Sequence, residues 1–110
     1  MIGIDIILVK KFKKIKVTDY NFWNKFYTKR EWRYCFSKAG SYNHLAGIFA
    51  AKEAIIKSYR KRIITNYSQI EILHKTIGEP YPKINGLIKK DMQISISHSH
   101  EYAVAIAFRN

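Results

Sequence analysis

The sequence lacks the features that cross-link small secreted proteins or anchor a chain in a membrane. Among its 110 residues Cys35 is the single cysteine, which excludes an intrachain disulfide and a Cys-based zinc site. No apolar stretch reaches the roughly 18 residues that a membrane span needs. Residues 1–9 are apolar, but Asp5 interrupts them and lysines follow rather than precede them, unlike a signal peptide. We therefore expect a cytoplasmic protein with no membrane partner.

Acidic residues are scarce as well. The chain has 8 Asp and Glu against 20 Lys and Arg, which gives a formal net charge of +12. Such a surface attracts nucleic acid, anionic membrane, an acidic protein or a phosphate-rich ligand, and composition does not choose among them. A basic surface that only keeps the protein in solution is an equally good interpretation of the charge alone.

The length and the pattern of apolar residues predict one α+β domain over residues 1–110. A chain of this size buries about 60–70% of its unfolded surface, and its hydrophobic share of 47% excludes a disordered segment. Short β-branched or alternating runs predict strands at residues 2–9, 70–74, 93–97 and 102–108, with a hairpin loop at residues 97–101. Helices are predicted from residue 18 or 19 to 26, from a capping box at Thr28 and Glu31, and over residues 41–59. Pro80 and Pro82 predict a turn or extended connection over residues 78–82.

Two places in this pattern carry polar side chains of the kind found in catalytic or binding sites. Asp5 stands inside an apolar strand, where a buried carboxylate is costly unless it is paired. Glu53 and Lys57 share a helix face with Ala46 and Ala50, so a carboxylate and an ammonium lie one turn apart beside small residues. Spacing alone favours simpler interpretations: an exposed i,i+4 ion pair worth about 0.3–0.5 kcal/mol, and a salt bridge at Asp5.

A series of short motifs resembles the holo-acyl-carrier-protein synthases in order and spacing across nearly the whole chain. The motif Phe49-Ala50-Ala51-Lys52-Glu53-Ala54 is specific, and the others gain weight together. In chain order the motifs are Gly3-Ile4-Asp5-Ile6, Phe26-Tyr27-Thr28 with Glu31 and Tyr34-Cys35, residues 45–54 with Lys57, Gly78-Glu79-Pro80, and Ile94-Ser95-Ile96-Ser97-His98 with Tyr102-Ala103-Val104-Ala105.

The resemblance implies a 4′-phosphopantetheinyl transferase-like fold, in which an antiparallel sheet packs on a long helix and three chains form a homotrimer. It implies Mg²⁺-dependent transfer of 4′-phosphopantetheine from coenzyme A to a serine of apo-acyl carrier protein in fatty acid biosynthesis, with release of 3′,5′-ADP. Hard oxygen ligands suit Mg²⁺, which takes one or two carboxylates, waters and substrate phosphates.

The same resemblance assigns roles to individual residues. Asp5 and Glu53 would hold Mg²⁺, and Lys57 would touch the pyrophosphate and stabilise the leaving 3′,5′-ADP. The group that accepts the serine proton, a water on the metal or a nearby carboxylate, stays open. Further coenzyme A-binding residues would be Ser97, His98 and Pro80. The basic residues proposed to dock the acidic carrier protein by electrostatic steering are Lys10, Lys11, Lys13, Lys14, Lys25 and Arg30.

The implied trimer would place active sites between chains, with the Gly78–Pro80 turn and the His98 loop supplied by a neighbour. Alanines along one face of the last strand suggest a sheet surface that a partner sheet covers. The pattern does not divide four branched residues between the core of one chain and this contact: Ile94, Ile96, Val104 and Ile106.

The chain departs from the family pattern at several positions. Ile48 stands where the family usually has Arg, Leu8 stands where an acidic residue often occurs, and the usual Gly-Thr-Gly after the signature helix is absent. We expect Arg60, Lys61 or Arg62 to substitute for the missing Arg. The remaining histidines, His44, His74 and His100, lack the spacing of a zinc site and are interpreted as structural.

Two rival functions follow from the same sequence. A small nucleic-acid-binding module would use the charge and the interleaved basic and aromatic residues of segments such as Lys25-Phe26-Tyr27. A purely structural trimer-forming protein would need no catalytic groups. Both leave Asp5 and Glu53 unexplained, and incubation with a carrier protein, coenzyme A and Mg²⁺ separates them from a transferase.

Overall fold

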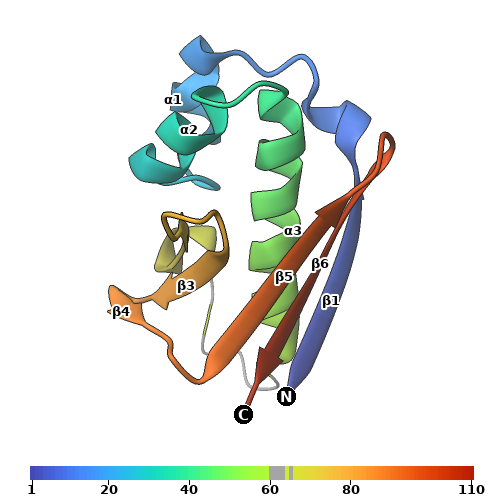
Figure 1. Cartoon of the computed structure of the whole chain (residues 1–110). Helices are drawn as coiled ribbons and strands as arrows, with labels where there is room; N and C mark the ends of the chain where they lie inside the picture. The colour runs from blue at the N-terminus through green and yellow to red at the C-terminus, as the bar shows by residue number, and fades with distance from the viewer. Residues whose placement is uncertain (60–63, 65) are drawn as a thin grey trace.

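Two three-stranded antiparallel sheets flank one long helix, α3, in the computed structural model of the chain (Figure 1). The structure describes residues 1–59, 64 and 66–110, so Arg60, Lys61 and Arg62, the expected substitutes for the family Arg, lie outside the described residues. The helices are α1 (Tyr20–Trp23), α2 (Lys29–Phe36) and α3 (Ser41–Ser58), and the strands are β1 (Ile2–Leu8), β2 (Ile70–His74), β3 (Pro80–Ile84), β4 (Leu87–Ile88), β5 (Met92–His98) and β6 (Tyr102–Arg109). No helix in the described part of the chain is both long and apolar enough to cross a membrane.

The first sheet has the strand order β1-β6-β5 and packs its inner face on α3. Side chains alternate between the faces of a strand, so the alanines of β6 all point one way. Ala103, Ala105 and Ala107 are fully or almost fully buried, which lets the helix approach closely. The approach is especially close at Gly3, where an added Cβ would lie 1.9 Å from the carbonyl oxygen of Ala54. Helix α3 therefore covers the alanine face, where the sequence had suggested a partner sheet. The face that a partner sheet can cover is the opposite one.

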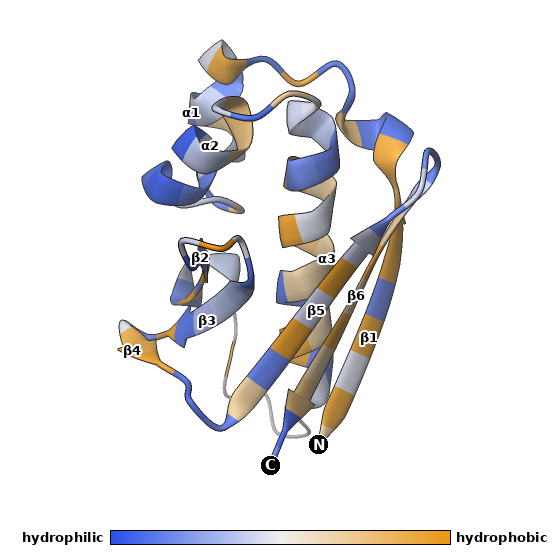
Figure 2. Ribbon diagram, in the orientation of Figure 1, coloured by the Kyte–Doolittle hydropathy of each residue, from blue (hydrophilic) through white to orange (hydrophobic). Residues whose placement is uncertain are grey.

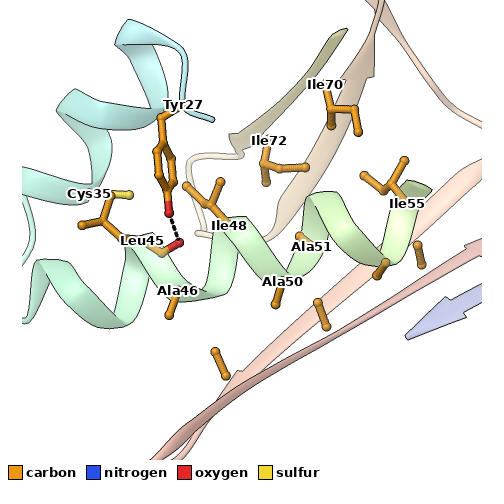
Figure 3. Close-up of a cluster of buried hydrophobic side chains, with 14 of the residues drawn as sticks. Tyr27, Cys35, Leu45, Ala46, Ile48, Ala50, Ala51, Ile55, Ile70 and Ile72 are labelled. Atoms are coloured by element: carbon orange, nitrogen blue, oxygen red, sulfur yellow. Dashed lines mark hydrogen bonds between the residues drawn. The ribbon is translucent and has the colours of Figure 1, made fainter. Parts of the chain in front are cut away.

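Helix α3 is buried on most of its sides, because the second sheet and α2 lie across from the first sheet. Ala46 and Ala50 point toward the first sheet, whereas Ile48 and Ile55 point toward α2 and β2 (Figure 3). Small residues face the sheet that comes closest, and branched residues fill the wider gap on the other side. The long helix predicted over residues 41–59 is thus confirmed to within one residue.

The second sheet has the order β2-β3-β4 and contains both prolines of the chain. The sequence predicted a turn or extended connection over residues 78–82, but Pro80 and Pro82 lie in β3 and pair with His74 and Ile72. The carbonyl oxygen of Pro82 accepts from the backbone N–H of Lys89, on the side away from β2. The missing proline N–H groups face that same side, so the β2–β3 ladder loses no hydrogen bond.

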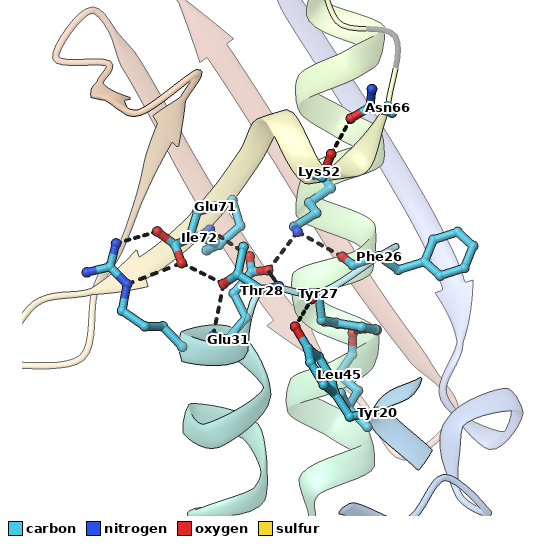
Figure 4. Close-up of polar contacts among 12 residues, drawn as sticks. Tyr20, Phe26, Tyr27, Thr28, Glu31, Leu45, Lys52, Asn66, Glu71 and Ile72 are labelled. Carbon is cyan, nitrogen blue, oxygen red and sulfur yellow. Dashed lines mark hydrogen bonds and ion pairs between the residues drawn. The ribbon is translucent and has the colours of Figure 1, made fainter. Parts of the chain in front are cut away.

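The capping box predicted at the start of α2 is present and extends into a buried ion pair (Figure 4). The backbone N–H of Thr28 donates to Oε1 of Glu31 at 2.7 Å, and the backbone N–H of Ile72 donates to its Oε2 at 2.8 Å. Lys52 Nζ lies 2.7 Å from Glu31 Oε1 and also donates to the carbonyl oxygen of Phe26 at 2.8 Å. Both charged side chains are fully buried, so this pair connects α2, α3 and β2.

Other boundaries differ from the sequence predictions by small amounts. The helix expected from residue 18 or 19 to 26 is a 3₁₀ turn, Val17–Asp19, followed by the single turn of α1. The backbone N–H groups of Phe26 and Tyr27 both bond to the carbonyl oxygen of Trp23, and the chain then becomes extended at Thr28, the N-cap of α2. Strands β5 and β6 form the predicted hairpin, each slightly longer than expected. Val9 belongs to a 3₁₀ turn rather than to β1.

Candidate active site

Asp5 points from β1 toward the C-terminal half of α3. It shares the inner side of the strand with Gly3, and the close approach at Gly3 brings the two elements together here. Asp5 Oδ1 lies 3.0 Å from Nζ of Lys57, which also donates to the carbonyl oxygen of Ile4 at 3.1 Å. The side chain of Asp5 is 15% exposed and that of Lys57 is 52% exposed, so the carboxylate is mostly enclosed while the ammonium faces solvent.

Glu53 lies one helical turn before Lys57 and accepts a hydrogen bond from the hydroxyl of Tyr67. The ring of Tyr67 is fixed between Phe26 and Phe49, with ring centroids 5.1 Å and 5.4 Å away. Burial raises the pKa of Tyr67 to about 12, together with the hydrogen bond to Glu53 and the charges of Glu53 and Asp5. The phenol is therefore protonated at neutral pH and serves as a hydrogen-bond donor, and the charges of both carboxylates contribute to its raised pKa.

These contacts decide between the interpretations that spacing left open. Among the described residues the ion-pair partner of Lys57 is Asp5, on another element, rather than Glu53 at i−4. Tyr67 was not found by sequence reasoning. It lies in a short 3₁₀ turn, Tyr67–Gln69, and belongs to none of the motifs. An aromatic residue three positions before a predicted strand carries no sequence signal of a bond to a glutamate.

The donor set at this place fits Mg²⁺ better than a tetrahedral metal. The described residues contain no group of three or more His, Cys, Asp or Glu side chains arranged to hold an ion. Structural zinc requires such a set, whereas Mg²⁺ is held by one or two carboxylates and completes its shell with water and substrate phosphates. Asp5 and Glu53 supply two carboxylates of this kind, with Lys57 beside them.

His98 and Pro80 lie together in a different place. They line a pocket of about 180 Å³ between α2, α3 and the two sheets. The other side chains around it include three that the sequence reasoning did not place there: Tyr34, His44 and His74. Ser97 is exposed and points to the opposite face of β5 from its neighbour His98, because adjacent strand residues alternate.

The two groups of predicted residues are separated along α3. A Cβ on Gly47 would lie 3.1 Å from Nε2 of His98, which places the His98 pocket beside the N-terminal half of the helix. Lys57 follows ten residues later, which corresponds to about 15 Å along the axis. Within one chain the structure therefore pairs Asp5 with Lys57 and places Glu53 beside them through Tyr67. It separately joins His98 and Pro80, without uniting the two groups.

A match to a family model assigns the chain to a protein family. The model described as the 4′-phosphopantetheinyl transferase superfamily matches residues 1–107 of the chain. The chain belongs to this superfamily. The resemblance found from its motifs is thereby confirmed, and with it the α+β fold of antiparallel sheets on a long helix.

Curated relatives of this transferase chain are holo-[acyl-carrier-protein] synthases. The protein from Thermodesulfovibrio yellowstonii is 43% identical over 105 residues, which cover 94% of this chain and 92% of the relative. The protein from Protochlamydia amoebophila is 39% identical over 118 residues, which cover 96% and 93%. Nearly full coverage of both chains shows that the likeness extends to the whole domain.

Solved structures of synthases from this superfamily share the fold. The Helicobacter pylori holo-[acyl-carrier-protein] synthase in complex with coenzyme A aligns with a TM-score of 0.81 and 26% identity and covers all of both chains. The Bacillus anthracis synthase in complex with CoA (3′,5′-ADP) aligns with a TM-score of 0.77 and 30% identity, covering 96% of this chain and 91% of that one.

The departures from the family pattern now have a structural setting. Ile48, at the position of the usual Arg, is 2% exposed and packs in the core beside the His98 pocket. Leu8 ends β1 and pairs with Tyr102 of β6. A buried apolar side chain at residue 48 supplies no positive charge to the pocket, so any anion bound there would depend on other groups.

The basic residues predicted to dock a carrier protein occupy two regions. Lys10, Lys11, Lys13 and Lys14 are exposed around the 3₁₀ turn Val9–Phe12 that follows β1, and Lys25 is exposed after α1. Arg30 is exposed as well, but its guanidinium already binds Glu71 through Nε at 3.2 Å and through a second nitrogen at 2.5 Å. The four lysines after β1 therefore form the freer group of cations.

Proposed function

We propose that this chain is a holo-[acyl-carrier-protein] synthase, which transfers 4′-phosphopantetheine from coenzyme A to a serine of a carrier protein. The observation that carries the proposal is the pairing of Asp5 with Lys57, with Glu53 one helical turn before Lys57 and both carboxylates acting on Tyr67, in a chain of this superfamily. Two carboxylates and an ammonium from β1 and α3 suit a reaction in which a charged pyrophosphate must be held and neutralised.

The reaction divides its tasks among these side chains. The serine hydroxyl gives up its proton to a nearby carboxylate or to water, and its oxygen bonds to the phosphorus that carries pantetheine. The bond from this phosphorus to the bridging oxygen breaks, and 3′,5′-ADP leaves with the electron pair of that bond. Asp5 and Glu53 would hold Mg²⁺, which supplies charge neutralisation of the pyrophosphate when bound. Lys57 would turn from Asp5 to the phosphate oxygens and stabilise the charge on the leaving group. Because Lys57 is half exposed, this movement requires no rearrangement of the core.

Tyr67 would keep the carboxylate of Glu53 in place during this exchange. Its ring is held by two aromatic neighbours, and its hydroxyl stays protonated at neutral pH because its pKa is about 12. A hydrogen-bond donor fixed on one oxygen of a metal-binding carboxylate leaves the other oxygen directed toward the ion. Groups that hydrogen-bond to metal ligands commonly orient them in this way.

The assembly that suits this site is a homotrimer. The outer face of the first sheet exposes Ile2, Ile4 and Ile6 by 61, 59 and 61%, and two of these pair across β1 and β6 with Phe108 and Ile106. A continuous apolar ladder of this kind marks an interface. A cyclic arrangement would cover it and bring the Pro80 and His98 pocket of one chain to the Asp5 group of the next.

The assembly is tested by sedimentation of Ile4→Lys, which places a charge at the centre of the ladder. We expect a trimer for the unchanged chain and smaller species for the variant, because three buried ammonium groups would repel one another. Mixed Glu53→Ala and His98→Ala chains should regain activity through sites that receive both intact residues. A stable monomer for the unchanged chain would refute the trimer, and a trimer without complementation would place each site within one chain.

The activity is tested by the mass of an apo-acyl carrier protein after incubation with the enzyme, coenzyme A and Mg²⁺. We expect a gain of one phosphopantetheine group. Asp5→Ala and Glu53→Ala should each abolish the gain and weaken Mn²⁺ binding, while Asp91→Ala, which removes an exposed carboxylate elsewhere, should change neither. No mass gain with the unchanged enzyme, or near-normal transfer by either site variant at low Mg²⁺, would contradict the assignment.

The four lysines that follow β1 are proposed to steer the acidic carrier protein. Reversing the charge of Lys13 and Lys14 should raise the KM for carrier protein and leave that for coenzyme A nearly unchanged. Reversal at Lys89 and Lys90 makes the same change of net charge on another part of the surface and serves as the control. Equal effects of both variants on both substrates would mean that the lysines act only through net charge.

A further inference from the structure

The ammonium of Lys57 lies on the carboxylate of Asp5, a candidate metal ligand. Its Nζ is 3.0 Å from Asp5 Oδ1, and it also donates to the carbonyl oxygen of Ile4 at 3.1 Å. The side chain of Asp5 is 15% exposed, so the ammonium covers part of a carboxylate that the chain already encloses for the most part. Lys57 thus places a cation of the chain itself on an oxygen of Asp5.

Two features of the fold hold the ammonium at this place. Lys57 belongs to the last turn of α3, where the carbonyl groups at a helix end attract positive charge. The close packing of β1 on α3 at Gly3 keeps the strand beside this turn (Figure 1). Asp5 and the carbonyl group of Ile4 are thereby kept within reach of the ammonium. The ion pair is consequently a defined contact between two elements.

The second carboxylate of the site has a different kind of partner. Glu53 lies one turn before Lys57 but forms no ion pair with any residue that the structure describes. It accepts from the hydroxyl of Tyr67, which carries no charge. A neutral hydroxyl orients a carboxylate without cancelling its charge, whereas an ammonium cancels it. Lys57 therefore neutralises one of the two candidate metal ligands, and that one is Asp5.

A divalent cation and the Lys57 ammonium compete for the same carboxylate. Two unit charges about 4 Å apart act on each other measurably even at the dielectric constant of water, and the charge of Mg²⁺ doubles this repulsion. The formal net charge of the chain is +12, so the rest of the surface also disfavours a free cation and attracts an anion. With Lys57 on Asp5, the site favours a pyrophosphate over a metal ion that arrives alone.

We propose that Lys57 is an internal counter-ion that makes metal binding depend on coenzyme A. The ammonium neutralises Asp5 until a pyrophosphate draws it away, and the carboxylate is then free to bind the ion together with Glu53 and the phosphate oxygens. The inference rests on the proposed function for the identity of the anion, and it gives Lys57 a role that precedes the transfer step. Because coupling between two ligands is reciprocal, the metal strengthens coenzyme A binding by the same factor.

Spin-resonance titration with Mn²⁺ alone, without nucleotide or carrier protein, tests the counter-ion directly. Lys57→Met keeps the length of the side chain and removes its charge. Since one neighbouring charge repels a divalent ion at about 4 Å, Mn²⁺ should bind this variant about 10-fold more tightly than the unchanged protein. Lys57→Gln, a second neutral variant, should behave in the same way.

Two control variants separate this local effect from net charge and from side-chain size. Lys57→Arg keeps the charge and should bind Mn²⁺ within about twofold of the unchanged protein. Lys90→Met removes one charge from an exposed lysine between β4 and β5, and it should also change Mn²⁺ binding less than about twofold.

Coenzyme A supplies the second half of the test. The Mn²⁺ titrations are repeated with saturating coenzyme A and corrected for the Mn²⁺ that coenzyme A binds in protein-free solution. Coenzyme A should tighten Mn²⁺ binding to the unchanged protein at least about 10-fold, and this factor should be smaller in Lys57→Met. Calorimetry of coenzyme A binding with and without Mn²⁺ should give the same factor for each protein.

Three results would overturn the inference. The first is that both neutral variants, Lys57→Met and Lys57→Gln, bind Mn²⁺ alone no more tightly than the unchanged protein. The second is an equal gain in Lys57→Arg or Lys90→Met, which would mean that the effect does not come from a charge on Asp5. The third is a coenzyme A effect of the same size in Lys57→Met and in the unchanged protein.

The outcomes also separate this inference from the proposed function. A chain that gains Mn²⁺ affinity in Lys57→Met but modifies no carrier protein in its unchanged form would keep the counter-ion and lose the enzyme. A chain that modifies carrier protein, while Lys57→Met and the unchanged protein bind Mn²⁺ alone equally well, would keep the enzyme and lose the counter-ion.

Discussion

Removal of the ammonium of Lys52 should destabilise this protein strongly, because it would strand a buried carboxylate. Glu31 and Lys52 are both fully buried, and their atoms lie 2.7 Å apart. Burial is the first cause that raises the pKa of Glu31 and lowers that of Lys52, while each partner opposes the shift of the other. In Lys52→Met, Glu31 keeps only the backbone N–H donors of Thr28 and Ile72.

The expected loss follows from the cost of an unpaired buried charge. Breaking a buried pair by removing one partner typically costs about 3–5 kcal/mol. For a domain of this length that loss lowers Tm by about 12–20 °C. The exposed pair of Lys75 and Glu79, at 3.2 Å, is the matched control, and Lys75→Met should cost less than about 0.5 kcal/mol.

Urea unfolding followed by the fluorescence of Trp23 and Trp32 measures both variants at one protein concentration. The double variant Glu31→Gln/Lys52→Met removes both charges, so it should lose less than the sum of the two single variants. It still leaves one of the backbone N–H donors facing an amide nitrogen, so some loss remains. A loss below about 1 kcal/mol for Lys52→Met, or strict additivity in the double variant, would refute the reasoning from buried charge.

Three further expectations test other contacts. Gly3→Ala places a Cβ 1.9 Å from the Ala54 oxygen, against about 3.3 Å for a normal contact, so urea melts should show a loss of at least about 1–3 kcal/mol together with loss of transfer. Tyr67→Phe removes only the hydroxyl on Glu53 and should weaken Mn²⁺ binding about 10-fold in spin-resonance titrations while stability changes little; unchanged binding would exclude a positioning role. Since the folded-state pKa of His74 is about 4, below its unfolded value of about 6.5, stability should decline as the pH falls through this interval, and the decline should be smaller in His74→Phe.

Local chemistry accounts for the parts of the fold that the sequence predicted well. Thr28 and Glu31 satisfy each other's backbone groups within one turn, and the structure has both bonds, at 2.7 Å and 3.2 Å. The second task of Glu31 depends on Lys52 and Ile72, 21 and 41 residues away, and no local pattern contains it. Strand β3 was missed for a related reason, since tolerance of its prolines depends on which neighbouring strand their missing N–H groups would face, and that is set by the pairing with β2 and β4.

The motifs predicted part of the candidate site, and the rest depends on contacts between distant segments. The motifs identified Asp5, Glu53 and Lys57, and the structure pairs Asp5 of β1 with Lys57 of α3, one helical turn after Glu53. Tyr67 was missed because an aromatic residue near a strand is ordinary, and its role exists only through a bond to a residue 14 positions earlier. His44 and His74 were interpreted as structural because zinc spacing was the criterion, whereas their convergence requires that α3 and β2 meet β5 in space.

The neighbours Lys52 and Glu53 explain why one short segment of α3 serves both the core and the site. Successive residues of an α-helix point about 100° apart around its axis. With Lys52 fixed on Glu31 in the interior, Glu53 must face Tyr67, and Lys57, a turn later, must reach Asp5. A rotation of the helix by one residue would bury the glutamate and carry the lysine away from β1. The buried pair therefore sets the rotation of α3, so Lys52→Met molecules that stay folded should bind Mn²⁺ more weakly although Lys52 touches neither carboxylate of the site. If folded Lys52→Met binds Mn²⁺ as tightly as the unchanged protein, the close packing of α3 on the alanine face of the sheet is enough to fix its rotation.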